Sequence, residues 1–227
     1  DAARAQVAGA MSALAQAAEA GSDSQVQFVQ ALASSAATPA QWEIVRQVRA
    51  GELALNGLDI DTDLSWQLLV ALAAGGAVTA AEIDAALAAD NTAKGGELAA
   101  QAKAALPSVA AKQLAWDSLI DTDEQPNTIV RATAAGFTHP ATVAQQAEFV
   151  GAYFDMLLPI WGARTYQIAQ YLIVGLYPAA MANAVLRDAT QAWLDANVDA
   201  PAALRRLVNE NVATVERALR VQERDAQ

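Results

Sequence analysis

The amino-acid sequence predicts an all-α fold, arranged as an irregular superhelical array of about a dozen short helices. Three observations support this prediction. Alanine dominates a composition that is 54% hydrophobic and only 6% aromatic, and alanine has the highest intrinsic helix propensity. Apolar residues recur at helical spacing along nearly the whole chain, and no sustained alternating pattern typical of strands occurs. Short polar turns separate the apolar segments.

Start and stop signals place the elements of the first half of the chain. In chain order, we expect a first helix at 3–19 that stops at Gly21, and a second helix that Asp23 caps and that ends near Ser35. A third helix should open at Thr38-Pro39 and stop at Gly51, and a fourth should be capped by Asp61-Thr62-Asp63 and end at Gly75-Gly76. A Thr79–Glu82 capping box should open the fifth helix, and the sixth should start at Asn91 or Thr92 and end at Pro107.

The second half follows the same logic. We expect a helix that Ser108 caps, and then a short helix from Pro126 to Gly136. A long helix should follow from about Thr142 to Trp161, with Pro159 kinking or fraying its end. The last three helices should run from about Ala163 to Leu176, from about Met181 to Asn197, and from Pro201 to a charged tail that frays after Arg220. The apolar face of the long helix should contain Val143, Val150, Phe154, Leu157 and Trp161.

The turns between these helices are short, and no Pro/Gly/Ser-rich linker divides the chain. We therefore expect a single helical domain, 1–227. Short helices joined by short turns favour stacked pairs, as in an α-solenoid of the HEAT or armadillo type, although no strict sequence repeat is present. Because the chain begins with Asp1 and already continues as helix, we expect it to be a part of a longer protein.

Charge and cysteine content limit the possible functions. The net charge is −11, with 14 basic residues scattered among 25 acidic ones, so we expect no nucleic-acid binding, which needs clustered Lys and Arg. There is no cysteine, which excludes disulfides and thiolate zinc sites. We expect a cytoplasmic location.

One uncharged segment, 165–186, is long enough to span a bilayer. It contains Gln167, Gln170 and Asn183, and the sequence Gly175-Leu-Tyr-Pro178 interrupts it near the middle. A buried helix that ends before Pro178 explains this segment better, so we expect no membrane span.

The sequence contains no catalytic metal site. A single histidine, His139, excludes HExxH and any site with two His ligands. We expect His139 to be a loop residue or helix cap rather than a general base. The acidic residues Asp121, Asp123 and Glu124 are expected in a solvated turn.

The alternating Asp59, Asp61 and Asp63 are expected to cap a helix, because no Glu completes a calcium loop. We expect the tryptophans on apolar helical faces to pack in the core; these are Trp66, Trp116, Trp161 and Trp193.

Two arginines are candidates for a binding role. Arg131 follows Ile129-Val130 on a largely apolar short helix, so it should either pair internally or face a cavity. The same applies, less strongly, to Arg164.

Several segments together resemble a known family. The stretch Asp61-Thr-Asp-Leu-Ser-Trp66-Gln-Leu-Leu resembles the C-terminal helical domain of bacterial, particularly actinobacterial, aminopeptidase N. Further stretches are similar in the same order: Lys112-Gln-Leu-Ala-Trp116, Pro126-Asn127 through Arg131 to Gly136-Phe137, Tyr153-Phe154 with Trp161 and Arg164, Gly175-Leu-Tyr-Pro178, and Leu204-Arg-Arg-Leu-Val208 with Arg217-Ala-Leu-Arg220.

The resemblance implies a role beside a catalytic domain. Members of this gluzincin family are zinc metallopeptidases that remove N-terminal residues from peptides, and their zinc is held by HExxH and a downstream Glu in a thermolysin-like domain. Their HEAT-like C-terminal domain closes over that catalytic domain and encloses the substrate chamber. This chain would therefore have no cofactor of its own, zinc being held in the parent enzyme.

The partners implied are the catalytic domain of the same polypeptide and peptide substrates. Arg131, Asn127 and Arg164 are then candidates to face the chamber. Two alternatives stay open: a stand-alone α-solenoid scaffold that binds partner proteins, and a stand-alone hydrolase that uses His139.

Overall fold

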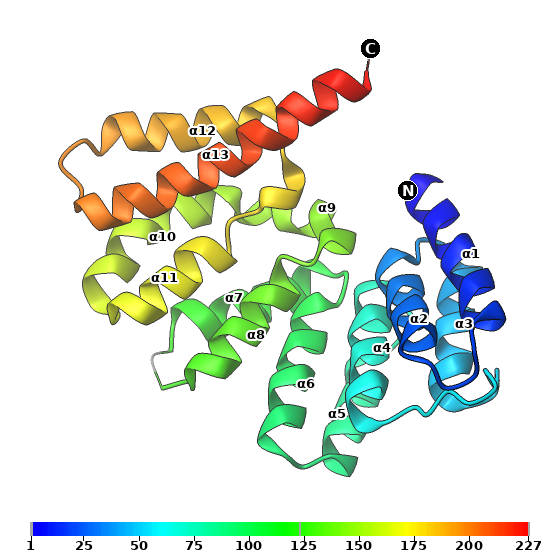
Figure 1. Cartoon of the computed structure of the whole chain (residues 1–227). Helices are drawn as coiled ribbons and strands as arrows, with labels where there is room; N and C mark the ends of the chain where they lie inside the picture. Colours follow the sequence, from blue (N-terminus) through cyan, green and yellow to red (C-terminus); the bar gives the residue numbers. More distant parts are fainter. Residues whose placement is uncertain (1, 123, 227) are drawn as a thin grey trace. The chain divides into compact units, whose positions relative to one another are not determined.

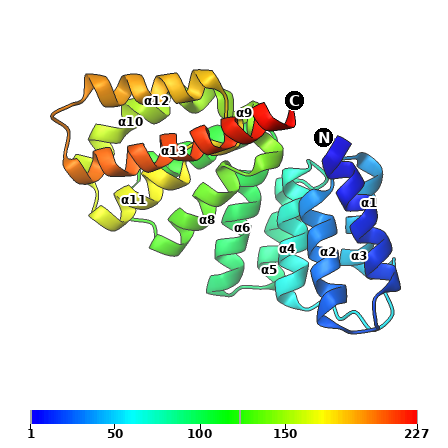
Figure 2. The ribbon, with the colours of Figure 1, turned by 45° about the horizontal axis from the view of Figure 1, so that its top comes forward.

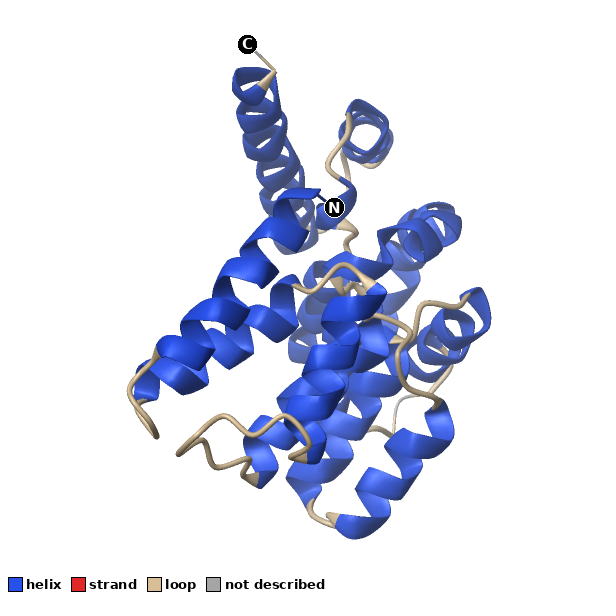
Figure 3. Ribbon diagram, turned by 90° about the vertical axis from the view of Figure 1, so that its right-hand side faces the viewer, coloured by secondary structure: helices blue, strands red, loops and turns tan. Residues whose placement is uncertain are grey.

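The computed structural model describes residues 2–122 and 124–226, and within these residues every regular element is a helix (Figures 1 and 3). The chain forms two compact units, Asp1–Pro107 and Ser108–Gln227. The all-α prediction is confirmed, whereas a single domain stays an expectation. No helix in the described part is long and apolar enough to cross a membrane.

The first unit contains six α-helices in paired layers. They are α1 (Ala2–Ala17), α2 (Asp23–Ser35), α3 (Pro39–Ala50), α4 (Thr62–Ala74), α5 (Ala80–Ala89) and α6 (Ala93–Ala105). Helices α2, α4 and α6 pack side by side, α1 packs against α2, and α5 packs against α6 (Figure 2).

Helix α4 is the centre of this unit. Its residues from Leu68 to Ala74 are all buried, so it contacts neighbours on every side rather than along one stripe. Trp66 is also buried, and its indole Nε1 donates to the Asp90 carboxylate at 2.7 Å. The pairing satisfies a polar group that burial would otherwise leave without a partner.

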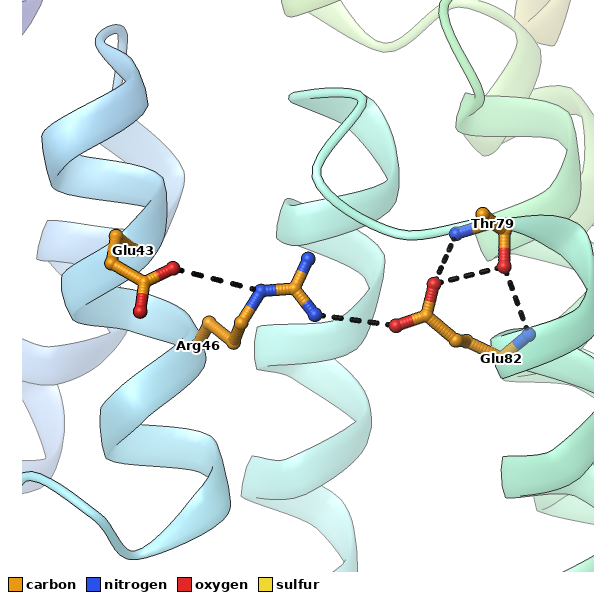
Figure 4. Close-up of polar contacts among 4 residues, drawn as sticks. All are labelled: Glu43, Arg46, Thr79 and Glu82. Carbon is orange, nitrogen blue, oxygen red and sulfur yellow. Dashed lines mark hydrogen bonds and ion pairs between the residues drawn. The ribbon is translucent and has the colours of Figure 1, made fainter.

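Local capping signals fix most helix starts in this unit. Asp61 accepts from the Leu64 amide at 2.7 Å, and Thr79 with Glu82 forms the predicted capping box. Figure 4 shows that Glu82 also pairs with Arg46 of α3 at 3.2 Å, which links α3 to α5. One predicted cap was wrong: Ser22 caps α2, and Asp23 is its first residue, where a carboxylate favours the helix dipole instead.

The second unit begins with α7 (Val109–Ile120) and α8 (Asn127–Phe137). It continues with the short α9 (Val143–Gln146), and its longer helices are α10 (Val150–Ala163), α11 (Tyr166–Gly175), α12 (Ala184–Ala196) and α13 (Ala202–Asp225). Three 3₁₀ turns, Pro140–Thr142, Ala147–Phe149 and Ala179–Met181, lie between them. Helix α11 packs between α8 and α13, α12 packs against α13, and α7 packs against α8.

The predicted long helix from Thr142 to Trp161 was wrong, because the 3₁₀ turn at Ala147–Phe149 interrupts it. The tighter turn coincides with the packing of Phe149, whose ring lies 5.4 Å from Trp116 and 5.1 Å from Phe137. Tertiary packing of one aromatic side chain therefore overrides a continuous helical pattern.

Two further details of helix ends differ from the predictions. Pro159 lies inside α10, which continues to Ala163. Leu157 of the predicted stripe is buried, as expected, but its buried neighbours are Tyr153, Met156 and Ile160, whereas Phe154 and Trp161 are half-buried. Helix α13 does not fray after Arg220 but continues to Asp225, and its Gln222 side chain donates to the Ala182 carbonyl at 3.1 Å. This contact anchors the last turns.

Candidate functional site

The exposed side of α8 presents two of the three candidate residues. Asn127 and Arg131 are one helical turn apart, and both are exposed. The Arg131 guanidinium lies over the ring of Tyr171 in α11, with Cζ 5.3 Å from the ring centroid. Arg131 is thus exposed and pairs with an aromatic ring, whose face holds its charge at the surface.

A second arginine–tyrosine contact joins α13 to α11. Arg206 of α13 donates to the Tyr166 hydroxyl of α11 at 3.2 Å and pairs with Glu210 at 2.9 Å. Tyr166 is itself exposed and packs edge-on against Trp161. We refer to Asn127, Arg131 and Tyr171 as the arginine–tyrosine surface.

This surface can act chemically as a hydrogen-bond donor. A guanidinium has five donors in a planar fork that fits carboxylates and carbonyl groups. Stacking on an aromatic ring limits the orientations of Arg131, so less entropy is lost when it binds a partner. The aromatic contact holds Arg131 at the surface of a strongly acidic chain.

Arg164 occupies a different place. It follows α10, is half-buried, and donates through Nη2 to the Ile120 carbonyl at the end of α7, at 2.8 Å. It lines a pocket of about 560 Å³ between α7 and α10. The structure therefore places Asn127 and Arg131 on one helix, and Arg164 at the end of α10 in contact with the end of α7.

His139 and the acidic residues near the end of α7 are the remaining polar candidates, and the described ones lie at helix ends or turns. The Nδ1 atom of His139 accepts from the Ala141 amide at 3.2 Å, so this residue caps the turn Pro140–Thr142. Of the acidic run at 121–124, Asp123 lies outside the described residues, and Asp121 ends α7. The described residues contain no group of three His, Cys, Asp or Glu that could hold a metal ion.

The four tryptophans that were expected in the core divide into two classes. Trp66 and Trp116 are buried, which confirms their expected core position. Trp161 and Trp193 are half-buried, so part of each indole reaches the surface.

Sequence reasoning missed a buried lysine. Lys112 in α7 is fully buried, and its Nζ donates to the Phe137 carbonyl at 2.9 Å and to the Gly136 carbonyl at 3.2 Å. These are carbonyls of the last turn of α8, where a cation is favoured. Desolvation by burial lowers the pKa of Lys112 to about 7. A spacing of 24 residues between partners leaves no local sequence signal for this contact.

A second network missed from the sequence joins three helices. The Tyr153 hydroxyl donates to the Ile173 carbonyl at 2.7 Å, and the Asn211 amide donates to both oxygens, at 3.0 and 3.1 Å. Burial raises the pKa of the Tyr153 hydroxyl. All three residues are buried, so the network fixes α10, α11 and α13 together rather than forming a reactive site.

Comparison with known proteins identifies similar sequences over nearly the whole chain. The ERAP1-like C-terminal domain family matches residues 1–217. A protein of Streptomyces lividans described as aminopeptidase N is 41% identical over 210 residues, which is 92% of this chain. The match covers 24% of that protein, so the chain spans about a quarter of its relative's length.

Proposed function

Because this chain belongs to the ERAP1-like C-terminal domain family, we propose that it is the non-catalytic C-terminal domain of a zinc-dependent aminopeptidase N. In this proposal it closes the substrate chamber and helps to admit and position peptides whose N-terminal residues are removed elsewhere in the same polypeptide. The observation that carries the positioning role is the exposed Arg131 guanidinium held on Tyr171.

The donor set of this chain does not fit a catalytic zinc ion. The sequence has one histidine and no cysteine, and a peptidase zinc site uses three protein ligands around one metal ion. We therefore derive no step through zinc from these residues. The chemistry of bond cleavage belongs to the catalytic part of the parent enzyme.

The contribution of this chain is geometric. Arg131 can donate hydrogen bonds to main-chain carbonyls or to a carboxylate of a peptide, and Asn127 provides an amide one turn away on the same helix. Holding a peptide at a point remote from the scissile bond restricts its position without changing the chemical step. Such contacts are made only by peptides long enough to reach the arginine–tyrosine surface.

The test is Arg131→Ala in the complete aminopeptidase. We expect KM for peptides of about eight residues to rise roughly three- to tenfold, which corresponds to the loss of about 0.7–1.4 kcal/mol, the net contribution of one ordinary hydrogen bond. The kcat/KM for an alanyl anilide should stay within about twofold, because this substrate has no chain beyond the scissile bond. The measurement is steady-state kinetics on both substrates.

The matched control is Arg187→Ala. Arg187 is a surface arginine of α12 that pairs with Asp188 and lies outside the arginine–tyrosine surface. It should leave both substrates unchanged. An equal loss on the anilide and on the peptide in Arg131→Ala, or equal effects of the two variants on the peptide, would contradict the positioning role.

A simpler observation separates this proposal from a stand-alone scaffold. The reading frame that encodes this chain should encode an HExxH motif upstream of it. A complete native chain without such a motif, bound to a partner unrelated to peptidases, would favour the scaffold.

A further inference from the structure

The pocket between α7 and α10 in the second unit has no part in the positioning role. Its volume of about 560 Å³ lies within the range typical of small-molecule sites. Its lining residues are Trp116, Ile120, Asp121, Ala152, Asp155, Met156, Pro159, Ile160, Ala163 and Arg164.

The apolar part of this lining is fixed by the core. Trp116, Met156 and Ile160 are all buried, and Trp116 packs against Phe149 at 5.4 Å. Buried side chains offer a preformed wall that a ligand need not order on binding. An aromatic or aliphatic group can therefore be desolvated against this wall.

The charged part of the lining is predominantly negative. Asp121 and Asp155 are exposed carboxylates of the pocket, and neither has an ion-pair partner in the part of the chain that the structure describes. The one cationic group of the lining, Arg164, already donates to the Ile120 carbonyl. Two carboxylates against one engaged guanidinium give a pocket that favours a cation.

The helix adds a further acceptor. Pro159 lies inside α10 and has no amide hydrogen, so the carbonyl of Asp155 lacks its normal helical donor four residues on. Both residues line the pocket. A carbonyl left without its helical partner gains from an external N–H donor.

We propose that this pocket binds a primary ammonium group on an apolar stem. The ammonium, with three N–H donors, would be held by the Asp155 carboxylate and by the Asp155 carbonyl, which has no amide donor at residue 159, and the stem would lie against Trp116 and Met156. A divalent metal ion fits less well, because the described residues bring no third acidic or imidazole ligand to this place. The inference does not depend on the role proposed for the arginine–tyrosine surface.

The test uses phenethylamine with this chain of 227 residues. Isothermal titration calorimetry at low ionic strength should show binding that weakens as salt is added, and the indole N–H resonance of Trp116 should shift during the titration. Phenethyl alcohol, which keeps the shape without the charge, and phenylacetate, which reverses it, should bind at least about fivefold more weakly. Equal binding of the three probes, or no binding of the amine at millimolar concentration, would overturn the proposal.

Two variants locate the site. Asp155→Asn should raise the Kd for phenethylamine about three- to fivefold, as expected for an exposed charge pair. Asp199→Asn is the matched control, since Asp199 is an exposed aspartate of the same unit outside the pocket, and it should leave the Kd unchanged. Equal effects of Asp155→Asn and Asp199→Asn would reduce the binding to general attraction by an acidic protein and contradict the site.

Pro159→Ala tests the carbonyl separately. It gives residue 159 an amide that can donate to the Asp155 carbonyl, so the ammonium loses one acceptor while the carboxylate stays. We expect weaker phenethylamine binding together with an unchanged or higher melting temperature. Tighter binding in Pro159→Ala would contradict the assignment of the carbonyl.

Discussion

At the residue scale, burial decides what individual side chains do. Arg131 and Lys112 are both cations on helices of the second unit, but one is exposed on Tyr171 and the other is enclosed and bound to the end of α8. The sequence places both on helices and singles out Arg131, whose apolar neighbours are conspicuous. It does not indicate Tyr171 as the partner or Lys112 as buried, because both contacts join residues far apart in the chain.

The buried amine predicts a dependence of stability on pH. The folded pKa of Lys112 is about 7, below its ordinary value of 10.5. Between these values the unfolded chain binds more protons than the folded chain, so this residue makes stability rise with pH from about 7 to 10. Below pH 7 both states are protonated, and the cost of burying the charge is fully present.

Lys112→Met should remove this contribution, because it replaces the amine by an apolar side chain of similar length. We expect the melting temperature of the variant to rise less between pH 7 and 9.5 than that of the unmodified chain. Circular dichroism melts at several pH values give the measurement. Parallel curves for the two proteins would show that Lys112 keeps a normal pKa.

At the element scale, local signals place most helix starts, and packing explains the failures. The caps Thr38, Asp61, Thr79 and Ser108 were predicted from the sequence and are present. A cap depends on a few adjacent residues, so it can be recognised locally. The break at Ala147–Phe149 could not be recognised from adjacent residues, because it accompanies packing of Phe149 against rings that are distant in the sequence.

Two adjacent glycines of α6 provide an element-scale prediction. A Cβ at Gly95 would overlap the Asp90 carbonyl oxygen, whereas a Cβ at Gly96 meets nothing within 4 Å. We expect Gly95→Ala to destabilise by about 1–3 kcal/mol through overpacking. Gly96→Ala should stabilise by up to about 1 kcal/mol through helix propensity.

Chemical denaturation of the two variants and the unmodified chain measures this difference. The two substitutions are identical in chemistry and one residue apart, so each serves as the other's control. Equal free energies of unfolding for the two variants would refute the close approach of Asp90 to α6.

At the scale of the whole molecule, the fold class follows from composition and periodicity, but the division into units does not. The boundary falls between Pro107 and Ser108, where a helix break was predicted and no linker was visible. The sequence of a short turn does not reveal whether it joins two helices of one unit or helices of two different units. The contact of Arg164 with the Ile120 carbonyl could not be predicted either, because the two residues are 44 positions apart in the chain.

For the chain as a whole, we propose that it is a domain of a zinc aminopeptidase whose catalytic centre lies elsewhere in the same polypeptide. The most direct measurement is hydrolysis of an alanyl anilide by the purified, folded chain of 227 residues in the presence of zinc, beside the complete aminopeptidase at the same concentration. We expect the complete enzyme to hydrolyse the anilide and the isolated chain to give the rate of buffer alone. Hydrolysis that copurifies with the isolated chain would contradict the account.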